Sequence, residues 1–142
     1  MIHIVYLDTR TNALELMLTG KKTMIAKGSM GRRIPYKRIE VGDTMYFLES
    51  KRNRDIDAKA KVLHVYYSGK LTEEESYELL DQYKTELRLN TSQYRKYAGK
   101  RYITLVNLSS VEKVTDRTLK DDSNINNEEW ILIEHLEELV EE

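Results

Sequence analysis

Cysteine is absent from this chain of 142 residues, and proline and phenylalanine occur once each. The lack of cysteine excludes disulfides, thiolate metal ligands and a cysteine nucleophile. No apolar run approaches the roughly 20 residues that a membrane-spanning helix needs. The first residues, MIHIVYLD, also lack the basic start and the small-residue cleavage site of a signal peptide. We therefore expect a cytoplasmic protein that has no membrane partner.

Familiar catalytic and cofactor motifs are missing as well. The histidines His3, His64 and His135 are far apart and have no spacing typical of zinc ligands. The chain has no Ser-His-Asp order, no Walker loop and no dinucleotide fingerprint, and the segment GSMG at residues 28–31 is too short for a phosphate-binding loop. The sequence therefore predicts no metal site and no cofactor.

The net charge of −1 conceals a strong segregation of charge along the chain. Residues 20–61 hold twelve Lys and Arg against five Asp and Glu, and residues 84–102 hold six against one. Residues 112–142 reverse this balance, with three against eleven. A block of like charge is often only a solvated face, but two basic blocks beside predicted strands favour an anionic partner.

The hydrophobic pattern predicts an α+β fold, a small mixed β-barrel with flanking helices. Strands are expected at residues 3–7, 23–26, 44–49, 59–67 and 102–108, with 111–114 extending the hairpin or ladder. The turn Val41-Gly42-Asp43 leads into the third strand, and a charged loop, 51–57, follows it. Neither face of segment 59–67 is cleanly apolar, so its lysine end is expected to project from the barrel.

Capping residues mark the expected helices. The expected helices run from Thr9 or Thr11 to Leu18, from Thr72 to about Leu87 and from Thr91 to Ala98. Gly20 and Gly99 are expected to close the first and the last of them. Thr72 and Glu75 match a capping box at the start of the middle helix.

The C-terminal part differs in composition. Residues 1–142 are expected to form one domain, in which 116–142 is an acidic C-terminal extension ending in a helix. Residues 116–128 are polar and loop-like, whereas apolar residues recur at helical spacing from Trp130 to Val140. A strand at Trp130–Ile133 is the competing interpretation.

Basic residues around the second strand and in the loop after it (residues 28–39) are the candidate nucleic-acid contacts. Arginine forks bind phosphate in a bidentate manner, and an aromatic side chain among them can stack on a base. The residues expected to contact nucleic acid are Lys21, Lys22, Lys27, Arg32, Arg33, Tyr36, Lys37 and Arg38. A cation just after a helix C-terminus is favourable in any case, which is a simpler explanation for Lys22.

The order of elements resembles the PUA-like superfamily, whose members are pseudobarrels that mostly bind RNA. Within it, the pattern G-x-K-x-x-E-x-R of the ASCH group is matched by Gly20, Lys22 and Lys27, with Lys in place of the final Arg and Ile25 in place of the Glu. The segments LTEEESYELL and LNTSQYRKYAGKRYITLVNLSSVEKV are similar to an uncharacterised archaeal family of PUA-like proteins, over most of residues 15–119.

The same resemblance implies one possible chemistry. Some ASCH proteins are small amidohydrolases that act on acetylated cytidine, and they use a Lys, a Thr and a more distant Glu. Lys22 matches the lysine, Ile25 stands at the threonine position, and the nearest glutamates are Glu73, Glu74 and Glu75. The missing hydroxyl argues against catalysis.

Three functions are therefore open. The leading hypothesis is a non-enzymatic module that binds RNA, with tRNA or rRNA as possible ligands. The second is a small hydrolase acting on a modified nucleoside or on RNA, with Lys22 and one of the three glutamates as its catalytic groups. The third is a reader of modified DNA bases, or a domain that docks to another protein through its acidic end. The oligomeric state does not follow from the sequence.

Overall fold

The computed structural model describes residues 1–8, 11–31, 37–49, 54–115, 117–119 and 130–135. Over these ranges the elements in chain order are β1 (Ile2–Tyr6), α1 (Ala13–Leu18), β2 (Met24–Ser29), β3 (Thr44–Leu48), β4 (Ala58–Tyr67), α2 (Glu73–Gln82), α3 (Lys84–Leu87), α4 (Thr91–Tyr97), β5 (Tyr102–Leu108), β6 (Glu112–Lys113) and β7 (Trp130–Ile133).

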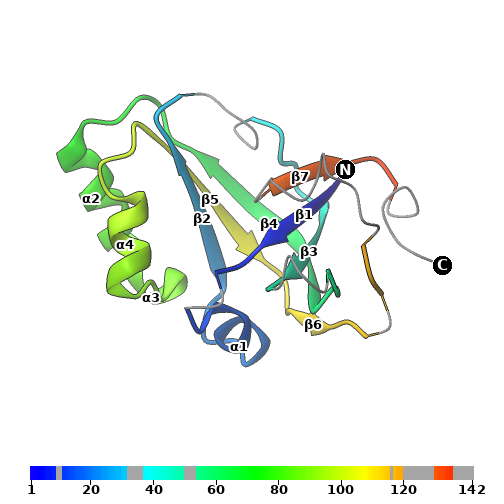
Figure 1. The fold of residues 1–142 in the computed structure, drawn as a ribbon. Coiled ribbons are helices and arrows are strands. Elements are labelled where there is room, and N and C mark those ends of the chain that lie inside the picture. Colours follow the sequence, from blue (N-terminus) through cyan, green and yellow to red (C-terminus); the bar gives the residue numbers. More distant parts are fainter. Residues whose placement is uncertain (9–10, 32–36, 50–53, 116, 120–129, 136–142) are drawn as a thin grey trace.

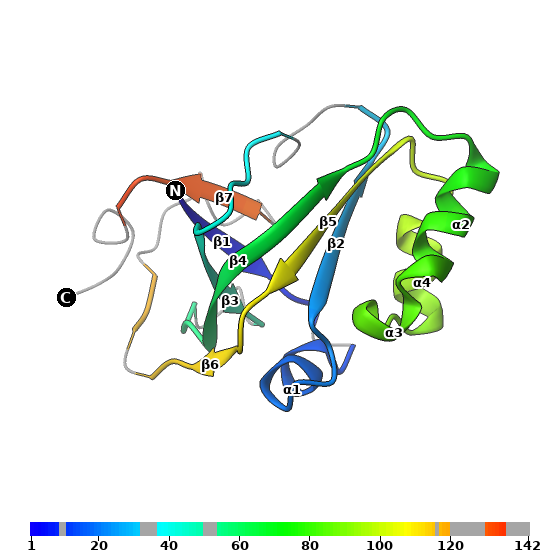
Figure 2. The same ribbon diagram turned by 180° about the vertical axis from the view of Figure 1, so that it is seen from behind.

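The strands form one mixed sheet in the order β2-β5-β4-β3-β1-β7, and β6 pairs with β4. The pair β1–β3 is parallel, whereas β7 joins β1 in the antiparallel direction. The sheet curls into a half-barrel with helices packed beside it (Figures 1 and 2). This arrangement confirms the expected α+β barrel-like fold. Because β2 and β7 are the two ends of the strand order, the half-barrel has an open seam.

A β-bulge in β4 gives the sheet its curvature. Residues 58–61 of β4 pair with β3, and residues 62–67 pair with β5. The register shifts between Val62 and His64, so Leu63 is the inserted residue and its side chain is 58% exposed. A bulge bends its strand and reverses which side chains face inward. Val62 is therefore buried on one side of the bulge while Val65 packs inward on the other, which is why neither face of this segment reads as apolar.

Two apolar layers fix the helices relative to the sheet. Inside the curled sheet, Phe47 and Met45 of β3 are fully buried in a cluster that also takes in Met17 of α1. On the outer face of β2 and β5, a second cluster packs Leu80 of α2 and Leu87 of α3 against the strands. As a result, α2, α3 and α4 lie together on one side of β2 and β5 (Figures 1 and 2).

Most of the predicted helix signals are confirmed. The Thr72 side chain and the Glu75 carboxylate form the expected capping box, and Gly20 and Gly99 have positive φ angles of 78° and 84°. The first helix differs in detail, because Thr11 is one residue before its N-cap, Asn12. The expected single helix from Thr72 to Leu87 is also wrong. It breaks at Tyr83 into α2 and α3, where Tyr83 packs into the cluster against β2 and β5.

The C-terminal helix is wrong over Trp130–Ile133, where the competing strand interpretation is confirmed. These four residues form β7 and pair with Ile2–Val5 of β1. Trp130 is buried in the core, which a local periodicity cannot anticipate. The end of the expected helix, residues 136–140, and the loop cations Arg32 and Arg33 lie outside the described residues.

Deletion of Leu63 tests the bulge. Without this residue β4 would alternate without a break and would keep Val62, Val65 and Tyr67 on the inner face, so the deletion removes only the bend. We therefore expect a loss of about 1–3 kcal/mol in the free energy of unfolding. The matched control is Leu63→Thr, which keeps the residue count and should change stability by no more than about 0.5 kcal/mol. Urea denaturation of the variants measures both effects, and a deletion variant as stable as the wild type would contradict this account.

Candidate functional site

A cavity of about 300 Å³ lies at the open seam of the half-barrel. It is lined by the end of β1, the start of α1, the strand β2, the helix α4 and the first residue of β7. Its lining residues are Val5, Tyr6, Leu7, Asp8, Ala13, Lys22, Ile25, Ala26, Lys27, Leu89, Ser92, Gln93, Lys96, Tyr97 and Trp130. The volume is at the lower end of the range typical of small-molecule sites, about 300–1,000 Å³.

The cavity is graded from a charged rim to an apolar interior. Lys96 is exposed, Lys27 is half-buried and Lys22 is buried. The interior side chains include Val5, Ala13 and Trp130, which are all buried. Among the described lining residues, Asp8 is the only acidic one, so cations outnumber anions by three to one. Such a site suits a ligand with an anionic end and a planar, less polar end.

Lys22 is the most unusual charge in this cavity. Its side chain is 4% exposed, and its Nζ donates a hydrogen bond to the carbonyl of Leu87 at the end of α3. Burial lowers the pKa of Lys22 from 10.5 to about 8. The ammonium therefore binds a helix C-terminal carbonyl, as expected on electrostatic grounds, but the helix is α3 rather than the preceding α1.

The helix α4 is held beside β2 by its cap and by a glycine. Asn90 and Gln93 form a capping box that starts α4. This signal is present in the sequence, but we predicted a capping box only at Thr72. Gly28 of β2 lies under the end of α4, and a Cβ at this position would lie 2.9 Å from Cγ of Lys100 and 3.5 Å from Cδ1 of Tyr97. The absence of a side chain at Gly28 thus leaves room for the Lys100 side chain, whereas the Tyr97 ring, which lines the cavity, would lie at ordinary contact distance from a Cβ.

Trp130, one of the lining residues, is hydrogen-bonded to a buried pair of polar side chains, His3 and Asp43. The Trp130 indole Nε1 donates to Nδ1 of His3 at 3.1 Å, and His3 Nε2 is 2.8 Å from Oδ2 of Asp43. Asp43 also accepts from the Glu40 amide at 2.9 Å and from the ammonium of Met1 at 3.1 Å. Burial raises the pKa of Asp43, but these hydrogen bonds outweigh it and hold the pKa below its ordinary value.

The structure brings some of the predicted nucleic-acid residues together and separates others. Lys22 and Lys27 line the cavity, and Lys21 is exposed beside them. Lys37 lies elsewhere, with its Nζ 5.3 Å from the centroid of the Tyr67 ring on β4, and the exposed Arg38 follows it. The remaining predicted contacts, Arg32, Arg33 and Tyr36, lie outside the described residues. Their roles stay predictions.

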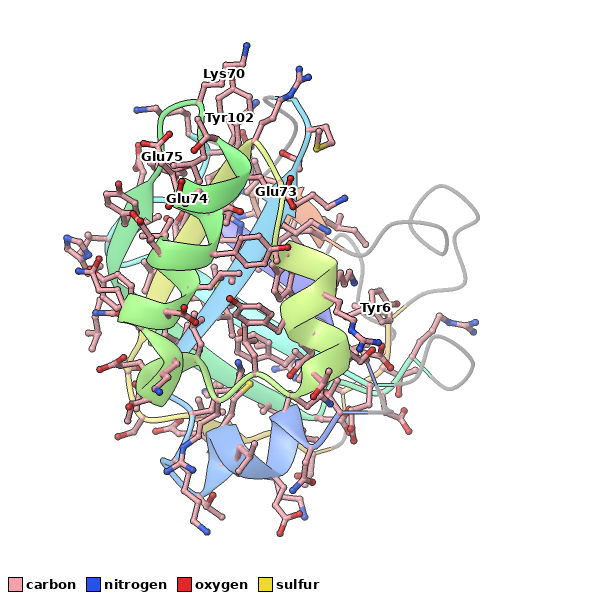
Figure 3. The ribbon with its side chains drawn as sticks, turned by 90° about the vertical axis from the view of Figure 1, so that its left-hand side faces the viewer. Tyr6, Lys70, Glu73, Glu74, Glu75 and Tyr102 are labelled. Atoms are coloured by element: carbon pink, nitrogen blue, oxygen red, sulfur yellow. The ribbon has the colours of Figure 1, made fainter. Side chains whose placement is uncertain are left out.

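The glutamates proposed as partners of Lys22 do not line its cavity. Figure 3 shows Glu73, Glu74 and Glu75 at one end of α2, well separated from Tyr6, which does line it. Glu75 accepts from the Thr72 amide in the capping box, and Glu73 accepts from the hydroxyl of Tyr77. The structure therefore gives these carboxylates a local role in α2 and places Asp8, rather than a glutamate, at the cavity.

Sequence reasoning missed several residues that line the cavity, above all Lys96, Tyr97 and Trp130. Lys96 belongs to the basic block 84–102, so the charge pattern contained part of the signal. For Trp130 the sequence contains no signal that it lines a cavity, because its apolar spacing favoured a helix, with a strand as the competing interpretation.

Within the described ranges, no group of three His, Asp or Glu side chains is placed to hold a metal ion. In the same ranges, no helix has the length and hydrophobicity to cross a bilayer.

A comparison with protein families matches residues 4–126 to the family described as "Domain of unknown function (DUF365)". The chain belongs to this family. A search of curated proteins finds no match.

Two solved structures of an ASCH protein confirm an ASCH-like fold. The ASCH protein from Zymomonas mobilis is similar with a TM-score of 0.58 and 19% identity, over 79% of this chain and 69% of that one. A serine-to-alanine mutant of the same protein gives a TM-score of 0.59 and 18% identity, over 80% and 71% of the two chains. The N-terminal domain of Thermococcus gammatolerans McrB bound to m5C DNA is more distant, with a TM-score of 0.45 and 14% identity over 81% and 76%.

The lowered pKa of Lys22 predicts a specific pH dependence of stability. Between pH 8 and 10.5 the unfolded chain binds more protons at this lysine than the native chain does, so native stability should rise with pH through this window. Urea denaturation should show that the wild type gains stability relative to Lys22→Met from pH 8 upward. The exposed neighbour offers the control Lys21→Met, which should follow the wild type. A constant difference between wild type and Lys22→Met would contradict the assignment.

Proposed function

We propose that this protein binds nucleic acid, with RNA as the first expected ligand, and that the cavity at the seam of the half-barrel takes one unpaired nucleotide. The observation that carries the proposal is the graded lining of the cavity. Lys96 and Lys27 lie where a phosphate can reach them, and aromatic and aliphatic side chains lie deeper. Unpaired bases in RNA are typically bound by aromatic stacking, with cations on the backbone.

Charge on the surrounding surface supports the same function. The helix α4 carries Arg95 and Lys96 in its last turn, and Lys100 and Arg101 follow it directly. Arg95, Lys100 and Arg101 lie close to the cavity-lining Lys96 in the chain and would add positive charge for the phosphates on either side of a bound nucleotide. The ASCH-like fold is consistent with this use, because members of the PUA-like superfamily mostly bind RNA.

Salt dependence tests the phosphate contacts. We expect the affinity for a single-stranded RNA of about 12 nucleotides to fall between about 50 and 200 mM salt, because bound phosphates release counterions. Replacing Lys27 and Lys96 together by Gln should weaken binding and flatten the salt slope by about 1.4, at about 0.7 per contact on a single strand. Fluorescence anisotropy of labelled RNA measures both quantities.

The matched control is the pair Lys59→Gln and Lys113→Gln on β4 and β6, which removes the same charge away from the cavity. A second arm, Arg32→Ala with Arg33→Ala, measures the contribution of the loop. Single-stranded DNA with and without modified bases distinguishes an RNA-binding module from a reader of modified DNA. No binding at low salt, or binding that salt does not weaken, would overturn the proposal.

One observation favours a second candidate, the hydrolysis of a modified nucleoside. Lys22 is buried in the cavity and has a pKa of about 8, so a neutral amine is accessible near physiological pH, as a general base requires. With the glutamates of α2 outside the cavity, Asp8 is the carboxylate that could assist it.

Incubation with acetylated cytidine tests this second candidate. If Lys22 acts as the base, the wild type should release acetate and Lys22→Met should lose the activity by at least about a hundredfold, the usual contribution of a general base. The control Lys59→Met, a lysine away from the cavity, should retain it. If the wild type releases no acetate while RNA binds, the hydrolase function is excluded and the binding function remains.

A further inference from the structure

Trp130 reaches the cavity from an edge strand, and a buried hydrogen-bonded chain holds it there. Its backbone pairs with Val5, another lining residue, and its indole is 8% exposed. The indole and the His3 ring meet edge to face, with centroids 5.9 Å apart and an angle of 77° between the planes. Trp130, His3 and Asp43 therefore connect β7, β1 and the turn before β3 across 127 residues of sequence.

The donors and acceptors of this chain define the state of His3. An indole N–H can only donate, so Nδ1 of His3 must accept and carries no proton. The single ring proton then lies on Nε2 and is donated to the carboxylate of Asp43. Both ring nitrogens are used, and the ring is fully buried, so His3 is a neutral structural link in the native protein.

The electrostatics agree with this geometry. Burial lowers the pKa of His3 below 6.5, although the hydrogen bond and charge of Asp43 act in the opposite direction. The charged groups that face His3 within the described residues are the Asp43 carboxylate and the Met1 ammonium, and the ammonium also lowers the pKa. Protonation of His3 would place an N–H on Nδ1 against the indole N–H, which would break the contact.

We propose that Trp130 is a ligand-contacting wall of the cavity and that the buried Asp43–His3 pair is the positioning element that holds its indole in place. This inference rests on the proposed function, because it assigns a contact to the base of the bound nucleotide. It goes beyond that function in making the cavity depend on His3 and Asp43, two residues that do not line it. Acid should then weaken binding by releasing Trp130.

The chain contains one tryptophan, so its emission reports this residue alone. Titration with the single-stranded RNA used above should change the Trp130 emission with the same midpoint as the anisotropy of the labelled RNA. Trp130→Leu should weaken binding about tenfold, within the range measured for loss of a stacking aromatic side chain. The matched control is Tyr66→Leu on β4, an exposed aromatic residue that does not line the cavity and should leave affinity unchanged.

A pH series tests the positioning role of His3. From pH 7 to about pH 5 the wild type should bind RNA more weakly, and iodide should quench the Trp130 emission more strongly. The reason is that His3 binds a proton more readily once the Trp130 indole is released than in the native state. In His3→Gln, which offers one donor and one acceptor but does not titrate, both pH responses should be absent. Trp130→Phe lacks the N–H and the tryptophan emission, so in this variant only the affinity is followed, by anisotropy; its affinity should show no pH response, and it serves if the glutamine variant does not fold.

The outcomes separate this inference from the proposed function. If RNA binds by anisotropy but Trp130 emission does not change and Trp130→Leu binds normally, the wall assignment is wrong and nucleic-acid binding stands. If the wild type and His3→Gln show the same pH dependence, His3 has no positioning role. If no RNA or DNA binds under any condition, both proposals are overturned.

Discussion

The strand β4 has to pair with two different neighbours, and the rest of the structure depends on how it does so. Its first half pairs with β3 and its second half with β5, and the inserted Leu63 turns the strand between them. The resulting curvature closes most of a barrel but leaves β2 and β7 as separate ends of the sheet. The cavity lies where this closure is incomplete, because residues of β1, β2 and β7 line it together. An unbroken alternation in β4 would give a flatter sheet with no such seam.

The energetics of the cavity follow from its half-closed geometry. Lys96 is exposed at the rim and keeps most of its hydration. Lys22 is buried, and the loss of hydration lowers its pKa to about 8. Lys22 has a structural role that would exist without any ligand, since it satisfies the Leu87 carbonyl and ties α3 to the start of β2. The same burial that places the Lys22 ammonium against this carbonyl also lowers the pKa of Lys22 to about 8, so its charge is adjustable near neutral pH.

Polar groups in the core connect the cavity to distant parts of the chain. Asp43 accepts hydrogen bonds from three residues, which are Met1 and His3 of the N-terminal segment and Glu40 of its own turn. His3 in turn accepts from the Trp130 indole. Buried polar groups are costly unless every member is paired, so such a chain has few alternative arrangements. This gives β7 a defined position, although it is a short edge strand with only four residues. A single-domain organisation for residues 1–142 remains the expectation from composition.

The sequence by itself determined many of the local elements. The capping box at Thr72, the closing glycines Gly20 and Gly99 and the alternation of the strands are signals within a few residues, and they were sufficient for an α+β, barrel-like fold. The basic blocks predict an anionic partner, which stays a prediction. Only the tertiary structure decided that Lys22, Lys96 and Trp130 share one cavity and that Trp130 begins a strand. The physical reason is distance along the chain: the contact between Trp130 and His3 joins residues 127 positions apart, and no local periodicity encodes it.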